Sequence, residues 1–151
     1  MKRLLLFLLL LPGCSDAGRE DLHEAFRDIP GEQWDRDSVI AFPVEIPAAG
    51  PRYLTLYLRH VIDIDQANLT CIVSLARNGL PVAEERADIR FVDERGRWRG
   101  KGSLLKTITH PVTRPVEVDT PGHYTVQVQH WMKQKRVKAI TAIGIQLHGK
   151  E

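Results

Sequence analysis

Apolar side chains alternate with polar ones along several short segments of this chain, and this period of two is its strongest structural constraint. In residues 53–60, Leu54, Leu56 and Leu58 occupy every second position. Residues 123–130 show the same alternation. Successive side chains of a β-strand point to opposite faces, so this pattern is typical of strands with one buried face.

Turn-forming residues separate these segments and set the expected number of strands. Asn78-Gly79 is a strong hairpin signal, and Pro121-Gly122 is a further turn. No long segment has a helical period. We therefore predict an all-β fold, an antiparallel β-sandwich of about seven to eight strands. The segments expected to form strands are residues 39–46, 53–60, 69–76, 87–92, 115–118, 123–130 and 142–147.

The first residues differ in kind from the rest. Lys2 and Arg3 precede an apolar run at residues 4–11, and the small residue Gly13 follows. A charged head, a short apolar run and a small residue describe a secretory signal. The run is far shorter than the roughly 20 residues that span a bilayer. We therefore expect residues 1–13 to be a signal peptide that is removed.

The residue after this signal decides its type. Leu11, Gly13 and Cys14 resemble the lipobox of bacterial lipoproteins, although Pro12 is unusual at its position. The resemblance implies that lipid is attached to Cys14, which anchors the chain to a membrane. An ordinary secretory signal with an incidental Cys is the alternative. The expected organisation is a signal peptide (1–13), a lipid-anchored tether (14–27) and a β-sandwich domain (28–151).

Charge and cysteine content exclude several functions. The chain has 21 Lys and Arg against 19 Asp and Glu, and Lys2 and Arg3 of the signal account for the excess. A neutral mature chain gives no reason to expect a nucleic-acid partner. With Cys14 lipidated, Cys71 has no partner for a disulfide. It alternates with apolar residues, so we expect a small buried side chain.

No motif for catalysis, metal or nucleotide binding stands out. The six histidines are scattered, and residues 63–68 lack the glycine and third ligand of a calcium loop. The glycines of residues 96–102 do not have the spacing of a phosphate loop, and no Gly-x-Ser-x-Gly is present. We expect no catalytic residues, no metal and no cofactor, so the protein is not expected to be an enzyme. A hydrolase with an unrecognised site is a weaker alternative.

Three glycines, a tryptophan and positive side chains are combined in residues 96–102. One interpretation is a tight connection whose glycines adopt positive φ, with Trp98 packed on the sandwich edge. The other is a partner-binding surface, because Trp and Arg are favoured interface anchors. The candidate surface residues are Arg97, Trp98, Arg99 and Lys101.

Further surface features leave alternatives open. The basic run at residues 133–138 predicts a solvated hairpin tip between the last two strands, or a face toward anionic lipid or an acidic protein. The three tryptophans, Trp34, Trp98 and Trp131, are expected in the core. Alternatively, they offer stacking surfaces for a carbohydrate.

A set of short segments along the chain carries a family resemblance: Ile29-Pro30 with Trp34, residues 37–42 and 45–47, Arg59, residues 68–75, Asp93 with Gly96-Arg97-Trp98, Gly100-Lys101-Gly102, residues 122–125, Gln129-His130 with Met132, and residues 140–145. On these segments the chain resembles the gliding-motility lipoprotein H (GldH) family from about residue 29 to residue 150. Residues 65–67 depart from the family, which often has Tyr-Pro-Tyr there. Asp37-Ser38-Val39 also resembles a short O-glycosylation site of the Bacteroidota.

The resemblance implies a non-enzymatic accessory protein of the Bacteroidota envelope, linked to gliding motility and the associated secretion machinery. Its expected partners are the membrane, through lipid on Cys14, and envelope proteins of that machinery. We expect it at the outer membrane, facing the periplasm. A carbohydrate- or peptidoglycan-binding lipoprotein is the alternative function.

Overall fold

The computed structural model describes residues 22–149, so the expected signal peptide and Cys14 lie outside the described residues. The elements in chain order are β1 (Leu22–Asp28), the 3₁₀ turn η1 (Pro30–Glu32), β2 (Gln33–Asp35), β3 (Ile40–Ile46), β4 (Gly50–Val61), β5 (Asn68–Arg77), β6 (Leu80–Arg90), β7 (Leu105–Pro111), β8 (Val116–Val118), β9 (Gly122–His130), β10 (Arg136–Lys138) and β11 (Ile140–His148). Within this range no helix is long and apolar enough to cross a membrane.

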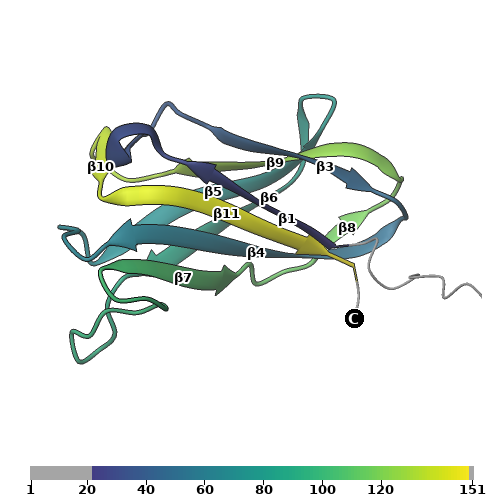
Figure 1. Ribbon diagram of the computed structural model, residues 1–151. Coiled ribbons are helices and arrows are strands. Elements are labelled where there is room, and N and C mark those ends of the chain that lie inside the picture. Colours follow the sequence, from purple (N-terminus) through teal and green to yellow (C-terminus); the bar gives the residue numbers. More distant parts are fainter. Residues whose placement is uncertain (1–21, 150–151) are drawn as a thin grey trace, which may run out of the picture.

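Two antiparallel sheets make up a β-sandwich (Figure 1). The first, called here the β4 sheet, has the order β1-β11-β4-β7, with β8 paired to the start of β4. The second, the β5 sheet, has the order β3-β9-β5-β6. The short strands β2 and β10 pair separately with each other. The predicted all-β, antiparallel sandwich is therefore confirmed.

The core lies between the sheets and follows the alternation in the sequence. Leu54, Leu56 and Leu58 of β4 are almost fully buried, as are Val126 and Val128 of β9. Residues on the inner faces of both sheets thus exclude water together, which is the main favourable contribution to folding.

Two local predictions are also confirmed. Cys71 is completely buried in β5, and burial raises the pKa of its thiol, so the group stays protonated and unreactive. The turn between β5 and β6 consists of Asn78 and Gly79, with φ of 52° and 78°. Two successive positive φ values match the twist of a tight hairpin.

The strand count was wrong, because residues 22–149 contain eleven strands. The strands that the pattern missed are β1, β2, β7 and β10. Both β2 and β10 contain only three residues, too few to show a period. Strand β7 lies at a sheet edge, and its only fully buried residue is Ile108. An edge strand with one buried position gives almost no hydrophobic pattern.

Strand β1 corrects the boundary of the expected tether, because residues 22–27 belong to the β4 sheet. They pair along β11, from Leu22 opposite His148 to Asp28 opposite Ala142. The sequence pattern missed β1 because this strand is held by a contact with a glycine that is distant in sequence. The ring of Phe26 lies over Gly144 and stacks on Tyr57, with ring centroids 5.4 Å apart.

Two histidines are completely buried at one end of the sandwich. Nδ1 of His60 lies 2.8 Å from the carbonyl oxygen of Val61, and Nε2 of His130 lies 3.1 Å from that of Trp34. Burial disfavours the charged imidazolium, so the pKa of each ring is lowered from its usual value of 6.5. Both rings are therefore neutral in the folded protein near pH 7.

The strands run between two ends of the molecule that differ in character (Figure 1). The tether end holds the start of β1, the end of β11 and the β3–β4, β5–β6, β7–β8 and β8–β9 connections. The far end holds η1 and the connections at residues 62–67, 91–104 and 131–139. Since β4 has twelve residues, the two ends lie about 40 Å apart.

The contact between Phe26 and Gly144 predicts an unusual double-mutant result. A Cβ on Gly144 would overlap the Phe26 ring, with even Cζ only 2.8 Å away. Gly144→Ala should therefore lower the free energy of unfolding by about 1–3 kcal/mol, measured by urea denaturation. In a Phe26→Ala background the same change should cost much less. An equal cost in both backgrounds would contradict this contact.

Burial of the two histidines predicts a loss of stability in mild acid. In the unfolded chain a histidine takes up a proton near pH 6.5, whereas the buried rings do not. The free energy of unfolding should therefore fall as the pH drops below 6.5. Asp35 and Asp93, whose pKa values are lowered from 3.8, lose their contribution only in stronger acid.

Thermal unfolding at pH 7 and pH 5 measures this effect, with His60→Gln as the test variant. The variant lacks one buried titrating ring, so its melting temperature should fall less between the two pH values. A pH dependence identical to that of the natural chain would show that His60 does not contribute.

Candidate functional site

The predicted partner surface forms one protruding loop at the far end, here called the 91–104 loop (Figure 1). Its base is closed by antiparallel bridges between Val92 and Trp98 and between Lys101 and Thr107. The structure brings the four predicted residues together on this loop, all of them exposed: Arg97, Trp98, Arg99 and Lys101.

The carboxylate of Asp93 organises the loop. Its Oδ1 accepts the backbone N–H groups of Arg95 at 2.9 Å and Arg97 at 3.0 Å. Its Oδ2 accepts Nε–H of Arg97 at 2.8 Å and forms an ion pair with Nη2 of the same residue. The backbone amide of Arg97 lowers the pKa of Asp93 most, and the Arg95 amide and Arg97 guanidinium lower it further. The carboxylate therefore stays ionised and keeps the loop in one shape near neutral pH.

The glycines of this loop have the role that the sequence predicted. Gly96 and Gly100 have φ of 72° and 91°, values that L-residues rarely adopt. A side chain at Gly100 would also place its Cβ 2.6 Å from the carbonyl oxygen of Thr107. Glycine is thus required here both for the backbone conformation and for close packing on β7.

Trp98 combines the two interpretations that the sequence left open. One side of its ring faces the buried His60, with ring centroids 5.7 Å apart. Yet 36% of the residue is exposed to solvent. Packing on His60 fixes the indole, and the exposed part is available to a partner.

The other two tryptophans, Trp34 and Trp131, differ strongly in solvent exposure. Trp34 is buried, as predicted, and its indole N–H donates to the carbonyl oxygen of Ser38 at 3.0 Å. Trp131 is 61% exposed, so its predicted place in the core was wrong. It directly follows His130, whose ring points into the core. Extending the alternation of β9 by one residue would have placed Trp131 outside.

The basic run at residues 133–138 is not simply a hairpin tip. Its second half forms β10, which pairs with β2 and buries Val137 completely. Two of its cations form ion pairs with acids: Arg136 with Asp35 at 3.3 Å and Lys135 with Asp37 at 3.5 Å. The run was expected to be solvated, and this holds for its charged side chains but not for Val137.

Two shallow hollows give the far end a basic and aromatic character. The first is lined by two acids, Asp93 and Glu94, and by four arginines: Arg90, Arg95, Arg97 and Arg99. The second is lined by Trp131 together with Arg36, Asp37 and Lys133. Both hollows are open surfaces, suited to contact with a protein or a glycan.

Ser38 lies exposed in the connection between β2 and β3, also at the far end. Its backbone N–H donates to the carbonyl oxygen of Asp35 in a turn. The O-glycosylation suggested by its short motif stays a prediction.

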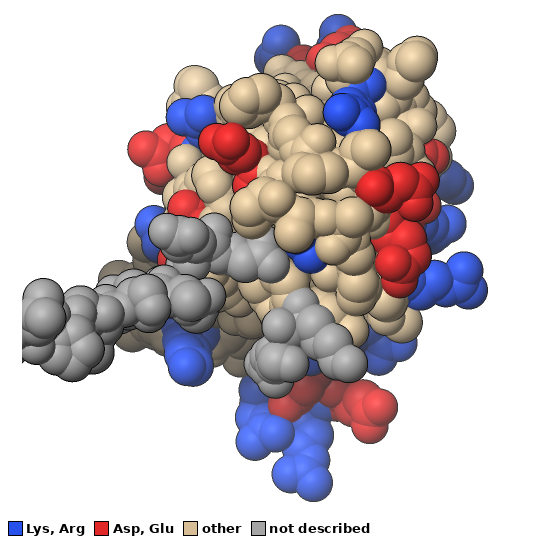
Figure 2. Space-filling model, turned by 90° about the vertical axis from the view of Figure 1, so that its right-hand side faces the viewer, with Lys and Arg blue, Asp and Glu red and all other residues tan. Residues whose placement is uncertain are grey.

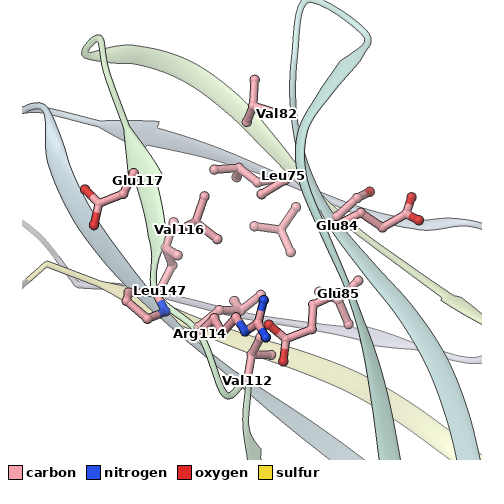
Figure 3. Close-up of a pocket in the computed structure, with 15 residues that line it drawn as sticks. Leu75, Val82, Glu84, Glu85, Val112, Arg114, Val116, Glu117 and Leu147 are labelled. Carbon is pink, nitrogen blue, oxygen red and sulfur yellow. The ribbon is translucent and has the colours of Figure 1, made fainter.

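A pocket of about 300 Å³ lies near the tether end, between β6 and residues 112–117 (Figure 3). Its walls are aliphatic, and the labelled wall residues are Leu75, Val82, Val112, Val116 and Leu147. Glu84, Glu85, Arg114 and Glu117 supply the charged groups. Glu85 accepts the backbone N–H of Thr113 at 3.2 Å. No sequence pattern indicates this pocket, because its walls come from six separate strands and a connection.

The chemistry of these sites is that of binding surfaces. The residues lining the pocket include no His, Cys or Asp. Among residues 22–149, no group of three or more His, Cys, Asp and Glu side chains could hold a metal ion. The arginine-rich loop can instead bind acidic groups through charge-assisted hydrogen bonds.

Comparison with models of protein families shows to which family the chain belongs. The model of the family described as GldH lipoprotein matches residues 21–147. The chain belongs to the GldH lipoprotein family. The family is not known as enzymatic, and membership in a lipoprotein family suggests a membrane-anchored location in the envelope. The match covers the GldH sandwich up to Leu147 of β11, and it includes both hollows of the far end.

Other comparisons add no argument about function. No curated protein matches the chain. Among solved structures, it is similar to dimeric latent PorU from Porphyromonas gingivalis, at 10% identity and a TM-score of 0.39, covering 91% of this chain and 14% of that one. It is also similar to VP2 of infectious bursal disease virus, at 12% identity and a TM-score of 0.36, covering 99% of this chain and 37% of that one.

Proposed function

We propose that this GldH lipoprotein is a non-enzymatic accessory component of the gliding-motility and associated secretion machinery. Lipid on Cys14 anchors it to the outer membrane on the periplasmic side. Its 91–104 loop binds an envelope protein of that machinery. Family membership supports the cellular role, and the loop supports the mode of action.

The observation that carries the proposal is the fixed, exposed arrangement of Arg97, Trp98 and Arg99. Tryptophan and arginine supply much of the binding energy at protein interfaces. Asp93 and the loop glycines hold these side chains before any partner arrives. Preorganisation lowers the entropy cost of association, so a small loop can bind usefully.

The charges of the loop indicate the kind of partner. Arginines outnumber acids around its hollow, since Arg90, Arg95 and Arg99 accompany the paired Arg97 and Asp93. An acidic protein surface complements this distribution and would also accelerate association.

A peptidoglycan or other envelope glycan is the second candidate ligand. The observation that favours it is Trp131, which stands 61% exposed in a polar hollow beside Arg36 and Gln129. Sugar rings stack on such exposed indoles, while polar neighbours bind their hydroxyl groups.

Removal of the anchor tests the cellular role. After depletion of the protein, secretion of a known cargo of the gliding-associated system should fail, and the natural chain should restore it. Cys14→Ser removes the acylated sulfur and should restore little, because two acyl chains give stable anchoring and an unlipidated chain has none. Normal secretion and spreading after depletion would overturn the role in this machinery.

Substitution of each exposed tryptophan distinguishes a protein ligand from a glycan ligand. Trp98→Ala should reduce secretion several-fold at unchanged protein level, whereas Trp131→Ala, the matched control at the same end, should not. Trp131→Ala removes a largely exposed indole, whereas Trp98→Ala also uncovers His60, so both variants must keep the melting temperature of the natural chain for this comparison. The opposite result, together with a tryptophan fluorescence response of the natural chain to peptidoglycan fragments, would favour glycan binding instead.

A further inference from the structure

The tether end has a surface unlike that of the far end. Its β3–β4 turn is Pro-Ala-Ala at residues 47–49, and its β5–β6 turn is Asn-Gly. In the described chain, the charged residues of its connections are Arg114 and Asp119, and Glu84 of β6 and Glu117 of β8 carry further charges near this end. Figure 2 looks onto this end and shows a broad area of uncharged residues over its middle. Such a surface can approach an apolar phase without the cost of desolvating many charges.

Exposed aliphatic side chains mark the same end. Leu80 is 71% and Val82 51% exposed, directly after the turn that begins β6. Leu22, at the start of β1, is 53% exposed. Strand β6 is also the edge of the β5 sheet. Apolar side chains on an exposed edge favour association, so proteins normally keep such edges charged or covered. The fold of this chain leaves Leu80 and Val82 uncovered.

Covalent geometry places a membrane beside this end. Seven residues separate Cys14 from Leu22, so the eight steps between their Cα atoms span at most about 29 Å when fully extended. Strand β1 starts at the tether end, so lipid on Cys14 keeps this end close to the bilayer. The far end lies about 40 Å further along the strands. A short tether also creates a high local concentration, so even a weak affinity for lipid is sufficient for contact.

We infer that the tether end docks on the phospholipid surface that holds the anchor, with Leu80 and Val82 inserted among the headgroups. The inference rests on the proposed lipidation of Cys14. Aliphatic side chains on a surface with few charges bind at the boundary between headgroups and acyl chains. The sandwich then stands on its tether end, and the 91–104 loop points away from the membrane. A bilayer is favoured over a protein as the occupant because the tether keeps it continuously within reach.

Two leucines of equal exposure provide the test. Leu80 at the tether end is 71% exposed and Leu104 at the far end 72%. Leu80→Cys and Leu104→Cys are labelled separately with an environment-sensitive fluorophore. Cys71 is completely buried and does not compete for the label, and the Cys14 sulfur is occupied by lipid. The full lipidated chain is placed in vesicles of phosphatidylethanolamine and phosphatidylglycerol that contain nitroxide-labelled lipid.

The expected result is quenching of the label at position 80 several-fold greater than at position 104, with emission shifted to the blue. Equal quenching at both positions, in chains that float with the vesicles, overturns docking and leaves the anchor intact. Chains that do not float overturn both the anchor and docking. An emission shift at position 80 that requires added envelope protein, without quenching, also overturns the inference and identifies β6 as a protein-binding edge.

Discussion

The pairing of β11 with both β1 and β4 joins the two ends of the chain, and the rest of the sandwich depends on it. Its inward residues Ile143, Ile145 and Leu147 are buried against the opposite sheet. Its outward Gly144 provides the flat site on which Phe26 rests. Strand β11 thus contributes to the core on its inner face and holds β1 in place through a contact on its outer face. Through β1 it also determines from which end the chain leaves toward Cys14.

The parts of the fold that the sequence predicted are those whose stabilisation is local or repetitive. The leucines of β4 recur at every second position because successive side chains of that strand face the core and the solvent in turn. Asn78-Gly79 favours a tight turn whatever surrounds it. Strand β1 could not be predicted in this way, since its sequence is mostly polar. Its attachment depends on a glycine more than 100 residues away, and nothing near Phe26 indicates that partner.

The same distinction applies to the site. The composition of residues 96–102 was enough to predict an exposed basic and aromatic loop with strained glycines. The role of Asp93 became visible only in three dimensions, because two amides and a guanidinium converge on one carboxylate. Trp131 was misplaced because aromatic residues are usually buried, whereas its position directly after the inward-facing His130 forces it outward.

The construction of the 91–104 loop also has an evolutionary consequence. Its backbone is held by Asp93, by Gly100 and by bridges at its base, whereas the exposed side chains at positions 95 and 99 contribute little to the core. Mutations at those exposed positions can alter the proposed binding surface without endangering folding. The proposed binding surface can therefore diverge in sequence while the sandwich beneath stays unchanged.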